Sequence, residues 1–306
     1  MGTPDIAAEC LTVLIRDGRD IIGVVTQPDK PKGRGNVMTP PPAKTVAQEN
    51  GIPVYQPQTL RSDEWDSCLR GLDPDIIVVV AYGKLLPHGT ISYPKYGCIN
   101  LHASLLPKYR GAAPIQRAIM CGERVTGVTV MMMDDGLDTG DMLMSEKIEI
   151  CPCDDCGTLK EKIADVGSRL LCTALDDIAA GRAVRTPQSD SCSCYAEKIT
   201  KEDCKLDFTK SAKKLCCIVR GLSPAPLACC RMPDGRMLKI AAAEPTEGSG
   251  VCGEVISADG KGEGSFTVAC GEGALRVKAV VPEGKGMMSA GDFVRGRKIN
   301  VKDVLC

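Results

Sequence analysis

Asp75-Ile76-Ile77-Val78-Val79-Val80 is the stretch that best indicates the fold, because a run of branched apolar residues follows a single acidic one. A run that is apolar on both faces is typical of a strand inside a parallel sheet, whose two faces are covered by helices. A second such run lies upstream at residues 21–25, and a short run with apolar residues on one face lies downstream at residues 98–102. These runs predict a buried sheet in an α/β domain.

Segments with helical periodicity alternate with these strands over the first half of the chain. Thr3 is placed to cap the first helix, with Pro4 at its first position and Gly18 near its end. The further expected helices are 43–50, 62–71, 114–120 and 157–180, and the further expected strands are 52–54 and 125–132. This order predicts a doubly wound, mostly parallel sheet of Rossmann-like type.

The start of the chain departs from this pattern. An α/β domain normally begins with a strand that leads into its first helix, whereas Gly2-Thr3-Pro4 stands directly after Met1. Without such a strand, its neighbours in the sheet would have unpaired backbone groups. We therefore expect the sheet to lack its first strand, and Met1 to be an internal methionine preceded by roughly five to ten further residues.

The second half of the chain has a different character. Residues 184–204 have the composition of a connector, with Thr186-Pro187 and a stretch rich in Ser, Asp and Cys. Short β-like runs separated by glycine turns follow at residues 237–240, 251–256, 265–269 and 274–281. Such runs are typical of a small β-barrel. The predicted organisation is an α/β domain at 1–183, a linker at 184–204 and a barrel domain at 205–306.

The chain has 18 cysteines among its 306 residues, which raises the question of disulfides or metal sites. It contains no long apolar run and no signal peptide, so we expect a cytoplasmic protein with reduced, mostly structural thiols. Cys151, Cys153 and Cys156 have no matching pair at zinc-finger spacing, and we expect no metal.

Charge is unevenly divided along the chain. Residues 205–306 carry 16 basic and 11 acidic side chains, although the whole chain has a net charge of −1. A basic second half suits a polyanionic partner, but an excess this small is equally typical of a solvated surface.

Two polar residues stand on the run Cys98-Ile99-Asn100-Leu101-His102. Side chains two apart on a strand share a face, so Asn100 and His102 point the same way. Asp138 follows on a glycine-flanked loop, Asp134-Asp135-Gly136-Leu137-Asp138-Thr139-Gly140. An amide that polarises a carbonyl, an imidazole that moves a proton and a carboxylate that holds it suit acyl-type chemistry. The spacing alone fits equally well a buried polar strand end that is satisfied by backbone.

The flanking residues decide between these interpretations. The chain continues as Ser104-Leu105-Leu106-Pro107 and Lys108-Tyr109-Arg110-Gly111-Ala112-Ala113-Pro114-Ile115-Gln116. Further matching motifs are Gly2-Thr3-Pro4-Asp5, Thr26-Gln27-Pro28-Asp29, Val79-Val80-Ala81-Tyr82-Gly83, Leu137-Asp138-Thr139-Gly140-Asp141-Met142 and Tyr195-Ala196-Glu197-Lys198. Over nearly its whole length the chain resembles the folate-dependent formyltransferases, and among them the branch that formylates initiator methionyl-tRNA.

The resemblance implies a reaction and a set of roles. 10-formyltetrahydrofolate would be the co-substrate, and the amino group of the methionyl residue would attack its formyl carbon. Asn100 and His102 would stabilise the negative carbonyl oxygen, with Asp138 setting the charge of the imidazole. The segment Ser104-Leu105-Leu106-Pro107 would form part of the folate-binding wall, although Leu and Pro there also suit an ordinary core.

A proline-rich loop, residues 28–42, carries Lys30, Lys32 and Arg34, with flexible glycines at positions 33 and 35. A structureless loop of this length is usually functional. The resemblance implies that these cations contact the tRNA, Arg34 above all, and the alternative is a solvated loop. It also implies a formyltransferase domain at 1–183 and an OB-like, tRNA-contacting domain at 205–306, in a monomeric protein without membrane contact.

Some residues depart from the family pattern, and rival functions share part of it. Ile6 replaces a phenylalanine, and Leu222-Ser223-Pro224-Ala225-Pro226 stands where Asn-Pro-Trp-Pro is usual. Glycinamide ribonucleotide formyltransferases resemble the first half but lack the second domain, and aminosugar-nucleotide formyltransferases lack the basic loop in this form. A tRNA-binding homologue with impaired catalysis is disfavoured by the intact Asn100, His102 and Asp138.

Overall fold

The computed structural model describes residues 1–32, 35–262 and 264–306. These residues group into two compact units. The first comprises Met1–Gly111, Val125–Glu149 and Lys160–Ala196, and the second comprises Ala112–Arg124, Ile150–Leu159 and Glu197–Cys306. Neither unit is therefore one continuous segment of chain.

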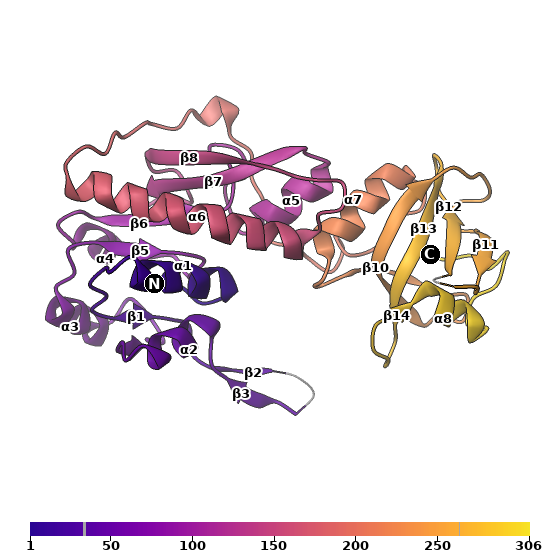
Figure 1. Cartoon of the computed structure of the whole chain (residues 1–306), viewed down its shortest axis with the longest axis horizontal. Helices are drawn as coiled ribbons and strands as arrows, with labels where there is room; N and C mark the ends of the chain where they lie inside the picture. The colour runs from indigo at the N-terminus through magenta and orange to yellow at the C-terminus, as the bar shows by residue number, and fades with distance from the viewer. Residues whose placement is uncertain (33–34, 263) are drawn as a thin grey trace. The chain divides into compact units, whose positions relative to one another are not determined.

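The first unit alternates helices and strands along the chain, as the sequence predicts (Figure 1). Its helices are α1 (Asp5–Arg16), α2 (Pro42–Glu49), α3 (Asp63–Leu72), α4 (His88–Ser92), most of α6 (Cys156–Ala179) and the short η1 (Asp190–Cys192). Its strands are β1 (Val24–Val25), β2 (Lys30–Lys32), β3 (Val37–Thr39), β4 (Val54–Tyr55), β5 (Ile77–Val79), β6 (Cys98–His102), β7 (Val125–Met132) and β8 (Met142–Glu149). The expected helices at 43–50, 62–71 and 157–180 and the strand at 125–132 are confirmed to within one residue at each end.

The strands of the first unit pair both in parallel and antiparallel. β1 pairs in parallel with β4, and β5 pairs in parallel with β6. β7 then pairs antiparallel with β6, and β8 antiparallel with β7. On β6, Asn100 lies opposite Val79 and Met131, and His102 lies opposite Thr129. The α/β class is confirmed, and the later strands add an antiparallel edge to its parallel part.

Met1 and Gly2 connect β1 with β5. The N–H of Gly2 donates to Val25 O at 3.0 Å, and the N–H of Val80 donates to Met1 O at 2.9 Å. Gly2 also forms a single parallel bridge with Val80, ahead of α1. Beside this segment lies a cavity of about 360 Å³. Its lining is mostly apolar and includes Cys10, Leu14, Trp65, Leu69, Ile77 and Leu175.

The predicted cap of the first helix is wrong. Pro4 is the N-cap of α1, and no side chain caps the helix. The Thr3 hydroxyl instead donates to Tyr82 O at 3.3 Å and accepts from Gln27 N–H at 3.3 Å. Those partners are 79 and 24 residues away along the chain, so a rule based on neighbouring residues could not identify them.

The proline-rich loop contains a hairpin, so the prediction of a structureless loop is also wrong. β2 pairs antiparallel with β3, with Lys30 opposite Thr39. This pairing satisfies backbone groups that an open loop would leave to water. Val37 and Met38 of β3 remain 66% and 59% exposed. Within the described residues of this loop, Lys30–Lys32 and Val37–Thr39 therefore form a strand pair with an exposed apolar side.

The second unit is built on an antiparallel sheet of strand order β11-β12-β13-β10-β9, with β14 paired to β13. Its strands are β9 (Ala228–Arg231), β10 (Met237–Thr246), β11 (Val255–Asp259), β12 (Ser265–Ala269), β13 (Ala274–Pro282) and β14 (Met288–Ser289), and its helices are α5 (Pro114–Cys121), α7 (Ala212–Leu222) and α8 (Ala290–Arg295). The end of the chain joins the two edge strands. Lys302 N–H donates to Val255 O of β11 at 2.8 Å, and Cys306 N–H donates to Arg231 O of β9 at 3.0 Å. The predicted second domain of antiparallel strands is confirmed.

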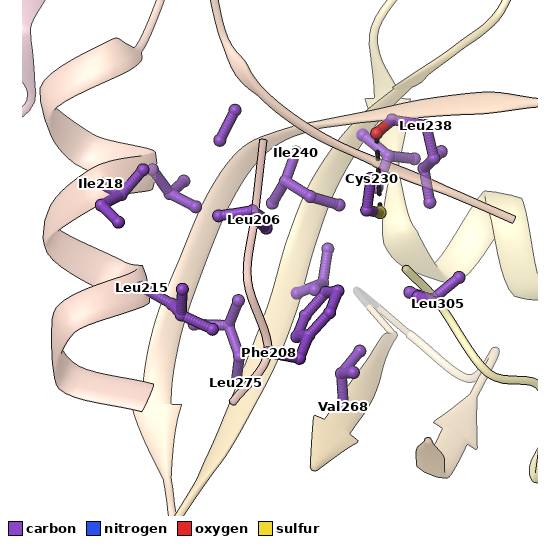
Figure 2. Close-up of a cluster of buried hydrophobic side chains, with 14 of the residues drawn as sticks. Leu206, Phe208, Leu215, Ile218, Cys230, Leu238, Ile240, Val268, Leu275 and Leu305 are labelled. Atoms are coloured by element: carbon purple, nitrogen blue, oxygen red, sulfur yellow. Dashed lines mark hydrogen bonds between the residues drawn. The ribbon is translucent and has the colours of Figure 1, made fainter. Parts of the chain in front are cut away.

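Figure 2 shows the core of the second unit, where Leu215 and Ile218 of α7 lie beside strands that carry Leu238, Ile240 and Leu275. Leu215, Leu238 and Leu275 are fully buried, each at 0% exposure. Burying one such side chain stabilises a fold by about 1.5–3 kcal/mol. The apolar face of α7 therefore packs the helix against the antiparallel sheet.

All eighteen cysteines are free thiols in the structure. Burial raises the pKa of Cys10, Cys98 and Cys230 to about 12, so these thiols stay protonated and unreactive. They act as small apolar side chains, as the sequence predicts. Across the described part of the chain, no helix combines the length and apolar character needed to cross a membrane.

Candidate active site

Strand β6 positions two polar side chains on one face of its sheet. Ile99 is 0% exposed and Leu101 is 5% exposed on the other face. Leu101 packs against α6 at Gly167, where an added Cβ would come within 2.8 Å of the leucine side chain. Because α6 covers this apolar face, the alternation of the strand turns Asn100 and His102 the opposite way.

His102 has an acceptor near each ring nitrogen. Nε2 lies 2.9 Å from Tyr109 O, and because a carbonyl oxygen only accepts, this nitrogen is assigned the hydrogen. Nδ1 lies 3.5 Å from Asp138 Oδ2. The side chains of His102 and Asp138 are 6% and 15% exposed, so water screens their interaction weakly.

The loop between β7 and β8 brings Asp138 to this site. Its Oδ2 accepts a hydrogen bond from Gly111 N–H at 2.8 Å, and its Oδ1 lies 3.5 Å from Asn100 Nδ2. Its backbone φ is +56°, a left-handed conformation that costs a non-glycine residue on the order of 1–3 kcal/mol. The structure thus brings Asn100, His102 and Asp138 together, and their catalytic roles stay a prediction.

Two other carboxylates of this loop have different partners. Asp134 accepts a hydrogen bond from the Thr139 hydroxyl at 2.7 Å. Asp135 lies 3.1 Å from His88 Nδ1, and the side chains of this pair are 69% and 75% exposed. His88 is therefore a surface histidine, as predicted, and Asp138 is the carboxylate that reaches the end of β6.

Thr129 of β7 holds the segment that follows β6. Its hydroxyl donates to Ser104 O at 2.7 Å and accepts from Leu106 N–H at 3.2 Å. Ser104 and Leu106 are buried at 0% and 7% exposure, whereas Leu105 and Pro107 are partly exposed. Of the four residues predicted to form the folate wall, Leu105 and Pro107 are thus the more accessible.

Two of the three cations predicted to contact tRNA, Lys30 and Lys32, belong to strand β2. Lys30 is exposed and Lys32 is the last residue of β2, while Arg34 lies outside the described residues. Beside them, Lys44 Nζ lies 2.9 and 2.8 Å from the two carboxylate oxygens of Asp29. The hydrogen bond from Lys44 holds the pKa of the Asp29 carboxyl below its usual range. The acidic neighbour of Lys30 is thus already paired with a lysine of α2.

Sequence reasoning missed the residues that support this site from behind. Thr129 is 0% exposed and Arg110 is 4% exposed. Gln188 donates a hydrogen bond to Asp138 O from 50 residues away. A threonine inside the apolar strand 125–132 and an arginine after β6 were available signals, whereas no spacing rule singles out Gln188.

The site offers hydrogen-bond donors and a carboxylate. Asn100 Nδ2 and the His102 ring can donate, and Asp138 can accept. Such a set can polarise a carbonyl and relay a proton. Within the residues that the structure describes, no three His, Cys, Asp or Glu side chains are grouped so that they could hold a metal ion.

Comparison with known proteins assigns this architecture to a family. Residues 1–175 match the formyl transferase family model, and residues 198–298 match the model of the formyl transferase C-terminal domain. The chain belongs to the formyl transferase family.

Named relatives and solved structures agree with this assignment. The chain is 46% identical over 299 residues to a methionyl-tRNA formyltransferase of Citrifermentans bemidjiense, covering 98% of this chain and 93% of that one. It is 45% identical over 305 residues to the methionyl-tRNA formyltransferase of Geotalea uraniireducens, covering 100% and 96%.

Two solved structures share the fold at lower identity. WlaRD, a sugar 3N-formyl transferase solved with dTDP and 5-N-formyl-THF, has a TM-score of 0.65 at 17% identity, covering 93% of this chain and 97% of that chain. HypX from Aquifex aeolicus, solved with tetrahydrofolic acid, has a TM-score of 0.63 at 18% identity, covering 83% and 44%.

Proposed function

We propose that this protein transfers the formyl group of 10-formyltetrahydrofolate to the α-amino group of initiator methionyl-tRNA, for translation initiation. One observation carries the proposal: Asn100, His102 and Asp138 converge at the end of β6 within a chain 46% identical to a named methionyl-tRNA formyltransferase. Relatives with that name favour a charged tRNA over a small amine as the acceptor.

The reaction makes one bond to the formyl carbon and breaks another. The lone pair of the methionyl amine attacks this carbon, and a carbonyl electron pair moves onto oxygen. When the carbonyl re-forms, the bond from carbon to N10 of the folate breaks. The amine loses a proton and N10 gains one, so atoms and electrons balance.

Each of the three converging residues has a proposed part in these steps. Asn100 Nδ2 donates a hydrogen bond to the oxygen while it carries negative charge. His102 donates alongside it and takes part in the proton traffic, directly or through water. Asp138 lies 3.5 Å from His102 Nδ1, where its negative charge supports a protonated ring.

The folate and the tRNA are proposed to bind at different places. The folate binds along Ser104-Leu105-Leu106-Pro107, next to the reacting groups. The tRNA contacts Lys30 and Lys32 of β2, Arg34, and the basic second domain. In this organisation residues 1–183 form the catalytic domain, 184–204 the linker and 205–306 the tRNA-binding domain, in a monomeric cytoplasmic protein.

The proposal is tested by offering the purified protein competing acceptors. Charged initiator tRNA, glycinamide ribonucleotide and an aminosugar nucleotide are each mixed with 10-formyltetrahydrofolate, and the formylated product is measured. We expect formyl-methionyl-tRNA as the main product. Formylation of a small amine in preference to the tRNA, or tight tRNA binding without any formyl transfer, would overturn the proposal.

A further inference from the structure

We propose that Gln188, oriented by Arg110, is a positioning residue. It holds the Asp138 loop, the connection between β7 and β8 at residues 133–141, in the conformation used for formyl transfer. This inference rests on the proposed function, in which Asp138 serves the reaction. Gln188 lies within residues 184–204, the segment proposed as the linker, and it belongs to the first unit together with the loop that it contacts.

A single side-chain amide bridges the backbone of the Asp138 loop. Gln188 Nε2 donates to Asp138 O at 2.9 Å and to Gly140 O at 2.7 Å. Asp138 has a φ of +56°, and such a strained conformation persists only where the surroundings restrain it strongly. The amide supplies that restraint at the backbone of the loop.

Arg110 determines which way this amide faces. Its Nε donates to Gln188 Oε1 at 3.0 Å. Because a guanidinium has donors and no acceptor, the amide oxygen must face Arg110 and the NH₂ group must face the loop carbonyls. The assignment of oxygen and nitrogen in Gln188 therefore follows from its partners on both sides.

Arg110 itself is placed at a cost in stability. It is 4% exposed, and its Nη1 pairs with Asp190 Oδ1 at 2.9 Å. Among the described residues, its Nη2 is buried without a hydrogen-bond partner. A buried donor without a partner costs folding free energy.

The backbone around Arg110 restrains the same carboxylate from a second direction. Arg110 N–H donates to Cys194 O at 2.9 Å, and Ala196 N–H donates to Arg110 O at 2.7 Å. The next residue, Gly111, donates its N–H to Asp138 Oδ2 at 2.8 Å. Asp138 is therefore held at its carboxylate by Gly111 and at its backbone by Gln188.

The segment that follows α6 runs beside the edge strand β8 and so brings Gln188 to this loop. Thr186 forms an antiparallel bridge with Met142 of β8, and in Figure 1 the chain after α6 runs past this strand. Freeing the loop would change the separation of Asp138 and His102, which is 3.5 Å between Oδ2 and Nδ1. A misplacement of about 1 Å at a reacting group can lower the rate roughly 100-fold.

The test replaces the donor while keeping the size of the side chain. Gln188→Glu can still accept from Arg110 but turns a carboxylate oxygen toward the two carbonyls. Gln188→Met removes both interactions, and Gln48→Glu on the exposed surface of α2 is the matched control. We expect kcat to fall roughly 10- to 100-fold in both Gln188 variants, with KM for both substrates little changed. Tm should stay near that of the unaltered protein in Gln188→Glu and fall in Gln188→Met, which leaves Arg110 Nε without its acceptor.

Arg110→Met tests whether the two residues act as one unit. If they do, the double variant Arg110→Met/Gln188→Met has about the same kcat as either single variant, because each change already frees the loop. Independent, multiplying losses would overturn the inference. If Arg110→Met does not fold, the two Gln188 variants decide.

Failure of this inference can be told apart from failure of the proposed function. If Gln188→Glu has a normal kcat while Asp138→Ala loses activity, the positioning role of Gln188 is overturned. The catalytic assignment of Asp138 then stays in place. A change confined to KM, or a loss explained by a lower Tm, also overturns it. Normal kcat in Asp138→Ala overturns both.

Discussion

The Asp138 loop and the β2–β3 hairpin are both connections in the first unit, yet they are held in opposite ways. The loop is tied to distant residues: Gly111 N–H binds the Asp138 carboxylate and Gln188 binds the loop backbone. The hairpin pairs with itself, and Val37 and Met38 stay exposed. The distant contacts of the loop fix the position of Asp138, whereas the hairpin leaves the side chains of Val37 and Met38 open to solvent.

This difference matches the two tasks proposed for these regions. A reacting group has to stay within about 0.5 Å of its productive position, which needs many restraints. Contacts to phosphates depend mainly on positive charge and tolerate variation in geometry. Changes in the loop should therefore alter the chemical step, and changes in the hairpin should alter tRNA use.

The largest effect is expected at the centre of the loop site. His102→Ala and Asp138→Ala should each lower formyl transfer about 10²–10⁴-fold, the usual loss for a positioned acid or base, while tRNA binding stays nearly normal. Single-turnover formylation and a separate tRNA-binding titration measure the two properties. His88→Ala, on the exposed histidine, is the control and should be silent. Near-normal turnover of either site variant would remove its catalytic assignment.

Asn100→Ala should come next, with a loss of about 10²–10³-fold in kcat, because a donor to the developing oxyanion would be missing. Asn300→Ala, an exposed asparagine of the second unit, provides the control. Rates are compared at saturating folate and tRNA. An effect on KM alone would assign Asn100 to substrate binding. Asn100 would then not share the catalytic role proposed for His102.

The buried α-amine of Met1 should make the folding stability depend on pH, an effect separate from the catalytic step. Burial lowers the pKa of the Met1 α-amine to about 6 from its usual 8.0. Between pH 6 and pH 8 the amine of the unfolded chain binds a proton and that of the folded chain does not. The unfolding free energy therefore rises with pH in this range. A chain that begins with Met1 should therefore gain about 2 kcal/mol in unfolding free energy from pH 6 to pH 8.

Denaturant unfolding at several pH values measures this gain, and acetylation of the amine is the control that should flatten the curve. A flat curve for the unmodified chain would mean that the amine is not buried as described. Activity measurements of the loop variants are best made near pH 8, where this loss of stability is absent.

The smallest effect is expected at the hairpin. Lys30→Ala and Arg34→Ala should weaken tRNA use and reduce the slope of log affinity against log salt by about 1 each, since one fewer counterion is released. Between 50 and 200 mM salt, this change corresponds to roughly a threefold to fourfold smaller loss of affinity. Folate affinity should not change. Lys147→Ala on β8 is the control, and an unchanged tRNA response would make the hairpin a solvated connection.

Rules of local pattern were sufficient for the parts of the molecule that depend on neighbouring residues. The alternation in Cys98-Ile99-Asn100-Leu101-His102 predicts a strand with two polar side chains on one face, and β6 has these bounds. The helix expected at 114–120 is α5, Pro114–Cys121, with proline at its start. In both cases the decisive contacts lie within a few positions along the chain.

The features that escaped prediction depend on distant partners. Thr3 binds Tyr82 and Gln27 instead of capping its own helix. Gln188 reaches Asp138 across 50 residues of sequence. Cys306 pairs with Arg231 of the edge strand β9. Such pairings are set by how the elements pack together, which one sequence read by itself does not specify.

The central claim is tested most directly by single-turnover formylation of initiator methionyl-tRNA with Asp138→Asn beside the unaltered protein. Asparagine keeps the size of the side chain and can still accept from Gly111 N–H, but it removes the negative charge that faces His102. We predict formyl-methionyl-tRNA from the unaltered protein and a rate at least about 100-fold lower from the variant. Equal rates in the two proteins, or no formylated tRNA from either, would contradict the account.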